Sequence, residues 1–365
     1  MSEGALRRRT SRGPTARSEV RDLMRRFLEE DERSEPLEWD SFTTANGLPH
    51  NWIYDVFQDS AGRMWVGTWG GGLAVREGGR WRAYGRRHGL ASDAVTCIRQ
   101  DAHGDIWAAT DAGLNRFDEA ADRFVAAGLT GVSILNIHFD RDRNLWAGCW
   151  RATRTGGGLH RFDGRRWHAF SKKEGLPSLE VLKVFEDSRG RIWVGTYEHG
   201  RGAGVGCWDG SSWQQFTRRD GLLDDCVYSM FEDPEGRMWF GTLKGVSVYG
   251  NGTWHRMTTA DGLVHDRVYA MFIDAEHRMW FGTEGGVSRF DGTNWEAFTR
   301  GSGLVEDLVR TIVQDRDGDL WFGTYPYARG KGGISRARTP RHRRSIAETT
   351  RDYLPPGPRR KLPPG

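Results

Sequence analysis

The sequence predicts an all-β protein, a single seven-bladed β-propeller of four-stranded blades, from three observations. A motif close to D-x-x-G-x-x-W-x-G-T recurs seven times in 365 residues, at intervals of 39 to 47 residues. That interval is typical of one four-stranded propeller blade. The content of 17 Trp and 49 Gly favours short strands and tight turns, and residues 39–336 show no convincing helical period. The motif places its Trp at Trp65, Trp107, Trp146, Trp193, Trp239, Trp280 and Trp321.

Each repeat divides into four strands, which we letter A to D. In the fifth repeat, strand A lies in "CVYSMFED", strand B in "RMWFGT", strand C in "VSVYG" and strand D in "TWHRMT". Gly, Asp and Asn stand at the breaks, where turns need a positive φ or an Asx hydrogen bond. A second set of Trp marks strand D of the repeats, at Trp39, Trp81, Trp167, Trp213, Trp254 and Trp295.

The two ends of the repeat region predict how the ring closes. A lone strand of type D, "WDSFT" at 39–43, precedes the first strand A, and the last repeat, 309–336, ends after its strand C. We therefore expect the N-terminal strand 39–43 to join the blade formed by 309–336. A ring closed in this way leaves neither the first nor the last blade incomplete or exposed at an open end.

The tails differ in composition from the propeller domain, 39–336. Residues 1–38 predict a mostly disordered extension with a short amphipathic helix about 18–31, and residues 337–365 predict a basic, Pro-rich disordered tail. Residues 1–17 carry a net charge of +4, 18–38 carry −4, 337–365 carry +6 and the body carries −2, giving the +4 of the chain. Nucleic-acid binding is therefore expected only through the Arg-rich tails, as the least favoured function.

Several classes of function are not expected. No stretch approaches the ~20 apolar residues of a membrane-spanning helix, and the N-terminal residues have no apolar run after their arginines. The sequence thus predicts a cytoplasmic protein without membrane insertion. The four cysteines form no CxxC pair or zinc pattern, and the Asp of each motif suits a turn rather than a calcium loop. We expect no metal, no cofactor and a monomer.

The repeats resemble those of a known family. "NGLPHNWIYDVFQDSAGRMWVGT" and its copies are similar to the two-component regulator propeller repeat, which runs N-G-L-P-x-N-x-V and then D-x-x-G-x-L-W-x-G-T. The resemblance implies a propeller of the kind that forms sensor regions of bacterial membrane histidine kinases and binds oligosaccharides or related ligands. This chain differs in having one set of seven repeats and no kinase or receiver segment. A more distant resemblance links it to streptogramin B lyase, a seven-bladed propeller that uses His and Glu residues for catalysis.

Residues that break the repeat are the better candidates for a site. Strand and turn positions shared by most repeats are expected to form the scaffold, whereas the surplus aromatics lie in D–A and B–C loops. These two sets of loops emerge on one face of a propeller, where aromatic side chains suit a sugar or a protein partner. The alternative is local packing of long loops. The candidate ligand-binding aromatics are Trp52, Trp69, Trp150, Tyr197, Tyr325 and Tyr327.

Two polar groupings belong to the same face. Asp225, Asp266 and Asp307 stand before strand A of three repeats, and we interpret them either as Asx turns or as part of a carboxylate ring that binds a polar ligand. Asn51 is the equivalent residue of blade 1. The residues directly before this position in blades 1, 6 and 7 are His50, His265 and Glu306. A His/Glu/His cluster could act in general acid–base catalysis.

The favoured function is a non-catalytic propeller that binds a small molecule, a glycan or a signalling protein on this aromatic face. A propeller lyase or hydrolase that uses the His/Glu/His cluster is the alternative.

Overall fold

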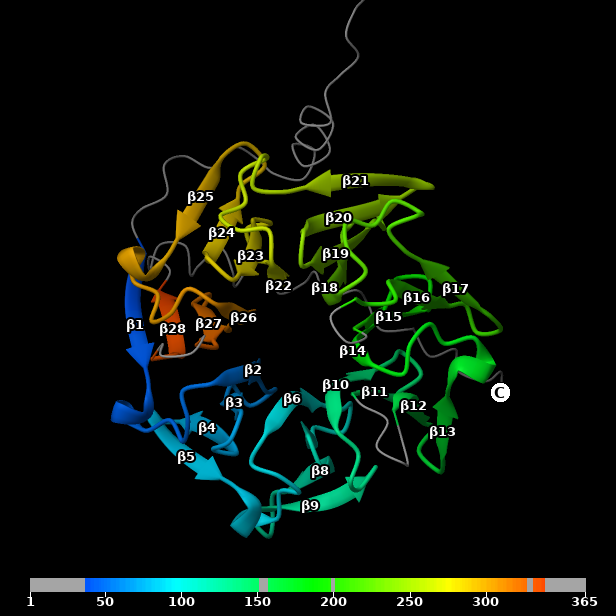
Figure 1. The fold of residues 1–365 in the computed structure, drawn as a ribbon. Coiled ribbons are helices and arrows are strands. Elements are labelled where there is room, and N and C mark those ends of the chain that lie inside the picture. Colours follow the sequence, from blue (N-terminus) through cyan, green and yellow to red (C-terminus); the bar gives the residue numbers. More distant parts are fainter. Residues whose placement is uncertain (1–36, 151–156, 198–200, 327–330, 339–365) are drawn as a thin grey trace, which may run out of the picture.

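The computed structural model describes residues 37–150, 157–197, 201–326 and 331–338, and these form a ring of seven sheets. Each sheet has four antiparallel strands, and the strands run outward from the centre of the ring in the order A to D (Figure 1). The seven-bladed propeller predicted from the repeat is therefore confirmed. The helix expected about 18–31 and residues 339–365 of the predicted tail lie outside the described residues.

The blades follow one another around the ring in chain order. Blade 1 contains β2 (Ile53–Gln58), β3 (Met64–Thr68), β4 (Leu73–Glu77) and β5 (Arg80–Tyr84); blade 2 contains β6 (Val95–Gln100), β7 (Ile106–Thr110), β8 (Gly113–Asp118) and β9 (Arg123–Gly128); blade 3 contains β10 (Ile134–Phe139), β11 (Leu145–Cys149), β12 (Gly158–Phe162) and β13 (Trp167–Phe170).

The second half of the ring repeats the same pattern. Blade 4 contains β14 (Val181–Glu186), β15 (Ile192–Thr196), β16 (Val205–Trp208) and β17 (Trp213–Phe216); blade 5 contains β18 (Val227–Glu232), β19 (Met238–Thr242), β20 (Gly245–Gly250) and β21 (Thr253–Met257); blade 6 contains β22 (Val268–Ile273), β23 (Met279–Thr283), β24 (Gly286–Phe290) and β25 (Trp295–Phe298); blade 7 contains β26 (Val309–Gln314), β27 (Leu320–Thr324), β28 (Gly333–Arg338) and β1 (Glu38–Phe42).

The N-terminal strand closes the ring, as the sequence predicts. β1 pairs antiparallel with β28, from Glu38 opposite Arg338 to Phe42 opposite Ile334. The Phe42 ring stacks on Trp321 at 5.4 Å, and Asp40 forms salt bridges with Arg336 and Arg338. The closing strand begins one residue before the predicted 39–43, and β28 continues two residues beyond the predicted boundary at 336.

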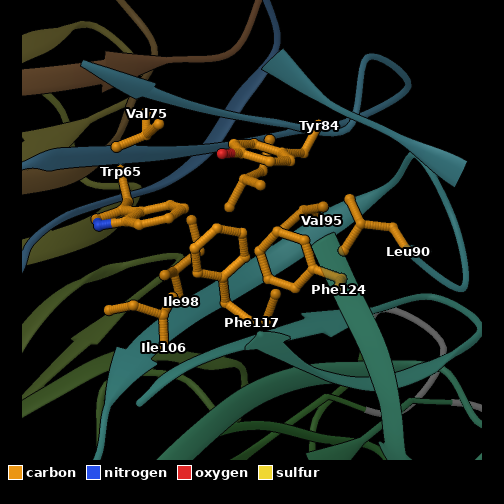
Figure 2. Close-up of a cluster of buried hydrophobic side chains, with 11 residues drawn as sticks. Trp65, Val75, Tyr84, Leu90, Val95, Ile98, Ile106, Phe117 and Phe124 are labelled. Atoms are coloured by element: carbon orange, nitrogen blue, oxygen red, sulfur yellow. The ribbon is translucent and has the colours of Figure 1, made fainter. Parts of the chain in front are cut away.

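The hydrophobic core lies between the blades. Figure 2 shows Trp65 and Tyr84 of blade 1 packed on Phe117 and Phe124 of blade 2, with Trp65 meeting the edge of Phe117 at 5.4 Å. The Trp of strand B is fully or almost fully buried in six of the blades. These side chains are scaffold, because each one fills the space between two sheets.

Two recurrent glycines allow this close packing. A Cβ on Gly195, two residues after the Trp of strand B, would lie 2.7 Å from the carbonyl oxygen of Val227 in the next blade. A Cβ on Gly262 would lie 2.4 Å from Trp295, and its φ of +128° also disfavours other residues. The first glycine thus makes room for the backbone of the next blade.

The recurrent Asp does more than form a turn. In blade 1, Asp59 Oδ1 accepts hydrogen bonds from the backbone N–H groups of Ala61 and Arg63, and Asp59 Oδ2 accepts them from Arg63 Nε and Trp65 Nε1. An Asp carboxylate accepts from the indole N–H of strand B at 2.7 to 2.9 Å in all seven blades. Asp and Trp therefore act as one unit that satisfies the only polar atom of each large buried side chain.

Candidate ligand-binding face and central channel

The A strands of the seven blades surround a central channel (Figure 1). The D–A and B–C loops lie side by side at one end of this channel. In blade 1, the backbone N–H of Trp69, directly after strand B, donates to the carbonyl of Trp52, directly before strand A, at 2.9 Å. In blades 4 and 7 the equivalent bonds join Tyr197 to Glu180 and Tyr325 to Leu308. The repeat thus fixes the backbone on which each surplus aromatic stands.

A β-bulge at the start of every strand A turns one residue toward the channel. The pairing between strands A and B shifts register after its first pair in all seven blades. The bulged residue is left out of the ladder, which is how bulges redirect side chains. The seven bulged residues surround a cavity of about 100 Å³ at the centre of the ring: Tyr54, Thr96, Leu135, Leu182, Tyr228, Tyr269 and Arg310.

Three of the predicted aromatics come together around Tyr54 at the junction of blades 7 and 1. The Trp69 ring stacks on Tyr54 at 4.9 Å and an interplanar angle of 23°. Tyr325 meets Tyr54 at 5.7 Å and Trp52 at 5.0 Å. All four side chains are partly exposed.

Arg310 connects this group to aromatics on blades 4 to 6. Its guanidinium lies 4.4 Å from the Tyr54 ring centroid and 6.0 Å from that of Tyr269. Tyr269 meets Tyr228 edge-on at 5.1 Å, and Tyr228 meets Tyr197 at 6.3 Å. The resulting contacts run around the channel mouth from blade 4 to blade 1. We name as the aromatic arc the residues Trp52, Tyr54, Trp69, Tyr197, Tyr228, Tyr269 and Tyr325.

Two predicted aromatics are not placed in the arc. Trp150 occupies the position after strand B in blade 3, and its backbone N–H donates to Ser133 at 2.8 Å. It therefore stands on the blade next to Tyr197. Tyr327 lies outside the described residues.

The predicted aspartates support the loops that carry them. The carboxylates of Asp225, Asp266 and Asp307 each accept a hydrogen bond from the backbone N–H seven residues earlier, at 2.7 to 2.8 Å. Asn51 and Asp93 make the same bond in blades 1 and 2. This recurrence gives the side chains a role in fixing the D–A loop.

His50, His265 and Glu306 are also held by their own loops. Nδ1 of His50 accepts from the backbone N–H of Trp52, and Nδ1 of His265 accepts from Arg267 in the same way. Glu306 accepts from the backbone N–H of Asp307. Within the described ranges, no hydrogen bond joins any two of the three side chains, and no group of three or more His, Cys, Asp or Glu side chains has metal-binding geometry.

The channel below the arc is electropositive. Arg99 pairs with Asp55 at 2.7 Å, and Asp55 also accepts from the backbone N–H of Ile98. Burial, together with the charges of Arg99 and Lys183, lowers the pKa of His138 to about 4. Burial and the charge of Arg99 likewise lower the pKa of Lys183. His138 is therefore neutral at pH 7. The charge of the channel comes from Arg99, Asp55, Lys183 and Arg310.

Sequence reasoning missed Tyr54, Tyr228, Tyr269 and Arg310. The signal was present, because the second residue of strand A varies from Tyr to Thr, Leu and Arg between otherwise similar repeats. A repeat pattern alone does not show that this residue is bulged out of the ladder and faces the channel.

Comparisons with known proteins agree with this architecture. The family model described as two component regulator propeller matches residues 47–70, 89–112, 175–198, 221–244, 262–285 and 303–325. The six matched repeats belong to the two-component regulator propeller family. The third repeat falls outside the matched ranges, yet it forms a complete four-stranded blade. No curated protein matches the sequence significantly.

Solved structures with the same fold include extracellular domains of two component systems and lyases. The extracellular domain assigned to hybrid two component system BT3049 from B. thetaiotaomicron is 20% identical, with a TM-score of 0.70 over 84% of this chain and 42% of that chain. Virginiamycin B lyase from Staphylococcus aureus is 12% identical, with a TM-score of 0.63 over 83% of this chain and 100% of that chain. Such identities show a shared fold. The chain spans about two fifths of the sensor structure's length.

Proposed function

We propose that this chain is a ligand-binding sensor propeller of a bacterial signalling system, and that it binds a small molecule or short saccharide on the aromatic arc without transforming it. The observation that carries the proposal is the arc itself. Its members occupy positions that vary between repeats, and all except the buried Tyr269 are partly exposed, whereas the Trp of strand B recurs and is buried in six blades. The family of the repeats favours sensing over other uses of the fold.

The chemistry of the arc suits a ring-shaped ligand. Tyr54 lies within 6 Å of Trp69, which stacks on it, and of Tyr325, which meets it edge-on. Such rings offer large apolar contact area at low cost in side-chain entropy, and their N–H and O–H groups can bond to polar substituents. The loop backbone beneath them is fixed by hydrogen bonds, so the surface is preorganised.

A binding screen of glycans and metabolites on the full chain tests the proposal. We expect a ligand that loses at least tenfold in affinity in Trp69→Ala and in Tyr325→Ala. Gln214→Ala, on exposed strand β17, is the matched control and should bind normally. Equal binding by all variants would place the site elsewhere. Product formation that His50→Ala abolishes would replace this proposal by the lyase or hydrolase alternative.

The cellular compartment belongs to the same proposal. Among the described residues, no helix is long and apolar enough to cross a bilayer. All four cysteines are free and buried, as is common in the reducing cytoplasm, whereas the sensor relatives are extracellular domains. We propose a cytoplasmic location. Fractionation of the tagged full chain tests it, and a periplasmic pool would contradict it.

A further inference from the structure

The central cavity contains more positive than negative charge. Its lining includes Arg99, Lys183 and Arg310, and its one acidic side chain is Asp55. The volume of about 100 Å³ exceeds the 10–15 Å³ that a single water requires. The cavity therefore has room for a small polyatomic group.

Arg310 is held by aromatic faces rather than by an acid. Its guanidinium lies 4.4 Å from the Tyr54 centroid and 5.9 Å from the Tyr325 centroid. In the part of the chain that the structure describes, no carboxylate or carbonyl accepts a hydrogen bond from this guanidinium. Its planar set of donors is thus oriented and unused, and this geometry matches the two oxygens of a carboxylate or phosphate.

Lys183 has no counterpart among the other repeats. It is the third residue of β14, where the other blades have Asp, Cys, Asn, Ser, Ala or Thr. Strand A therefore folds without a cation at this position. Lys183 is only partly buried and forms no salt bridge over the described ranges, and partial burial of an unpaired ammonium destabilises a fold. The scaffold does not explain why a lysine is here.

The third cation, Arg99, is paired with the one acidic side chain of the cavity. Arg99 donates from Nη1 to Asp55 and to the carbonyl of Ile98. Asp55 offsets one of the three positive charges, so a net positive charge remains in the cavity. In a site with limited water access, such a charge attracts anions more strongly than it would at the surface.

We propose that this cavity is a binding site for an oxyanion, a carboxylate or a phosphate group, held by Arg310 and Lys183. The site deepens the proposed function, because Tyr54, Tyr228 and Tyr269 of the aromatic arc line it, and it would select ligands that join a ring to an acidic group. Arg99 contributes charge and remains paired with Asp55.

Isothermal titration of the full chain with inorganic phosphate and with malonate, at low salt, tests the inference. We expect at least one anion to bind, with at least tenfold weaker affinity in Lys183→Met and in Arg310→Gln. Lys173→Met makes the same change in the exposed η3 turn (Lys172–Glu174) and should bind normally. The tighter of the two anions identifies the acidic group. Arg99 is left unchanged, because its removal would leave Asp55 unpaired.

The outcomes separate this inference from the proposed function. Trp69→Ala should still bind the inorganic anion, since Trp69 does not line the cavity. Failure of the glycan and metabolite screen with anion binding intact would overturn the arc and leave the cavity site. Absence of both anions at millimolar concentration, or equal affinity in all variants, would overturn the cavity site. Circular dichroism melts confirm that each variant is folded.

Discussion

The most specific structural prediction concerns the buried Asp–Trp unit of blade 1. The Asp59 side chain is 0% exposed and accepts four hydrogen bonds, two on each oxygen. In Asp59→Asn, Oδ1 can still accept from the two backbone N–H groups. The new Nδ2 would instead face Arg63 Nε and Trp65 Nε1, which lie 2.6 and 2.7 Å from the present oxygen.

Two charge-assisted hydrogen bonds are therefore lost, and buried donors are left without an acceptor. Hydrogen bonds to charged groups contribute about 1.5–3 kcal/mol each, so we expect the free energy of unfolding to fall by about 3–6 kcal/mol. Arg63 keeps its salt bridge with Glu119, which places the loss toward the lower end of this range.

Blade 2 offers the matched control for this substitution. Asp101 accepts from two backbone N–H groups and from Trp107 Nε1, and the position of Arg63 is taken by Asp105. Asp101→Asn should lose one bond to a partly exposed indole, or about 1–2 kcal/mol. Urea denaturation of both variants measures the difference. Equal losses, or a loss below about 1 kcal/mol for Asp59→Asn, would refute the reasoning.

Three further predictions concern ring closure and the channel. Phe42→Ala removes the ring that stacks on Trp321. Because Phe42 is partly buried, urea denaturation should show that the free energy of unfolding falls by about 2–3 kcal/mol. An unchanged free energy of unfolding would contradict closure of the ring by β1. Asp40→Asn should destabilise by about 1 kcal/mol at pH 7. Burial raises the pKa of Asp40, but Arg336 and Arg338 lower it below 3.8 overall, so the difference from wild type should persist above pH 4 and vanish on further acidification; a pH-independent difference would contradict this. Lys183→Met should raise the melting temperature at pH 7. The pKa of Lys183 is lowered from 10.5, so the wild-type protein should regain stability as the pH rises toward that value. A variant less stable than wild type would contradict the claim that the Lys183 charge is uncompensated.

The repeat explains why the ring could be predicted from sequence. Because the motif occurs seven times, the strand boundaries can be assigned from all copies together. The unmatched strand at 39–43 can complete only the last blade, which lacks its strand D. The same comparison separated Trp69, Trp52 and Tyr325 from the scaffold, and the structure brings these three together around Tyr54. The propeller geometry places both loop types at one face, so their proximity followed from topology.

Side-chain directions could not be obtained in this way. The bulge that turns Tyr54 and Arg310 to the channel leaves no mark in the alternation of strand A. Similarly, the position of His50 and His265 on one face does not fix where their rings point, and each is bound to its own loop. The bond from Trp65 to Asp59 joins a turn to a strand six residues later, a contact that the turn motif alone does not indicate.

The central claim is that ligand binds at the channel mouth and leaves unchanged. Fluorine NMR of the full chain labelled with 5-fluorotryptophan tests it directly, using the tightest ligand from the binding screen. We predict that the resonances of Trp52 and Trp69 shift, that those of buried Trp239 and Trp280 stay in place, and that the ligand is recovered intact. Shifts confined to other tryptophans, or a chemically altered ligand, would contradict the account.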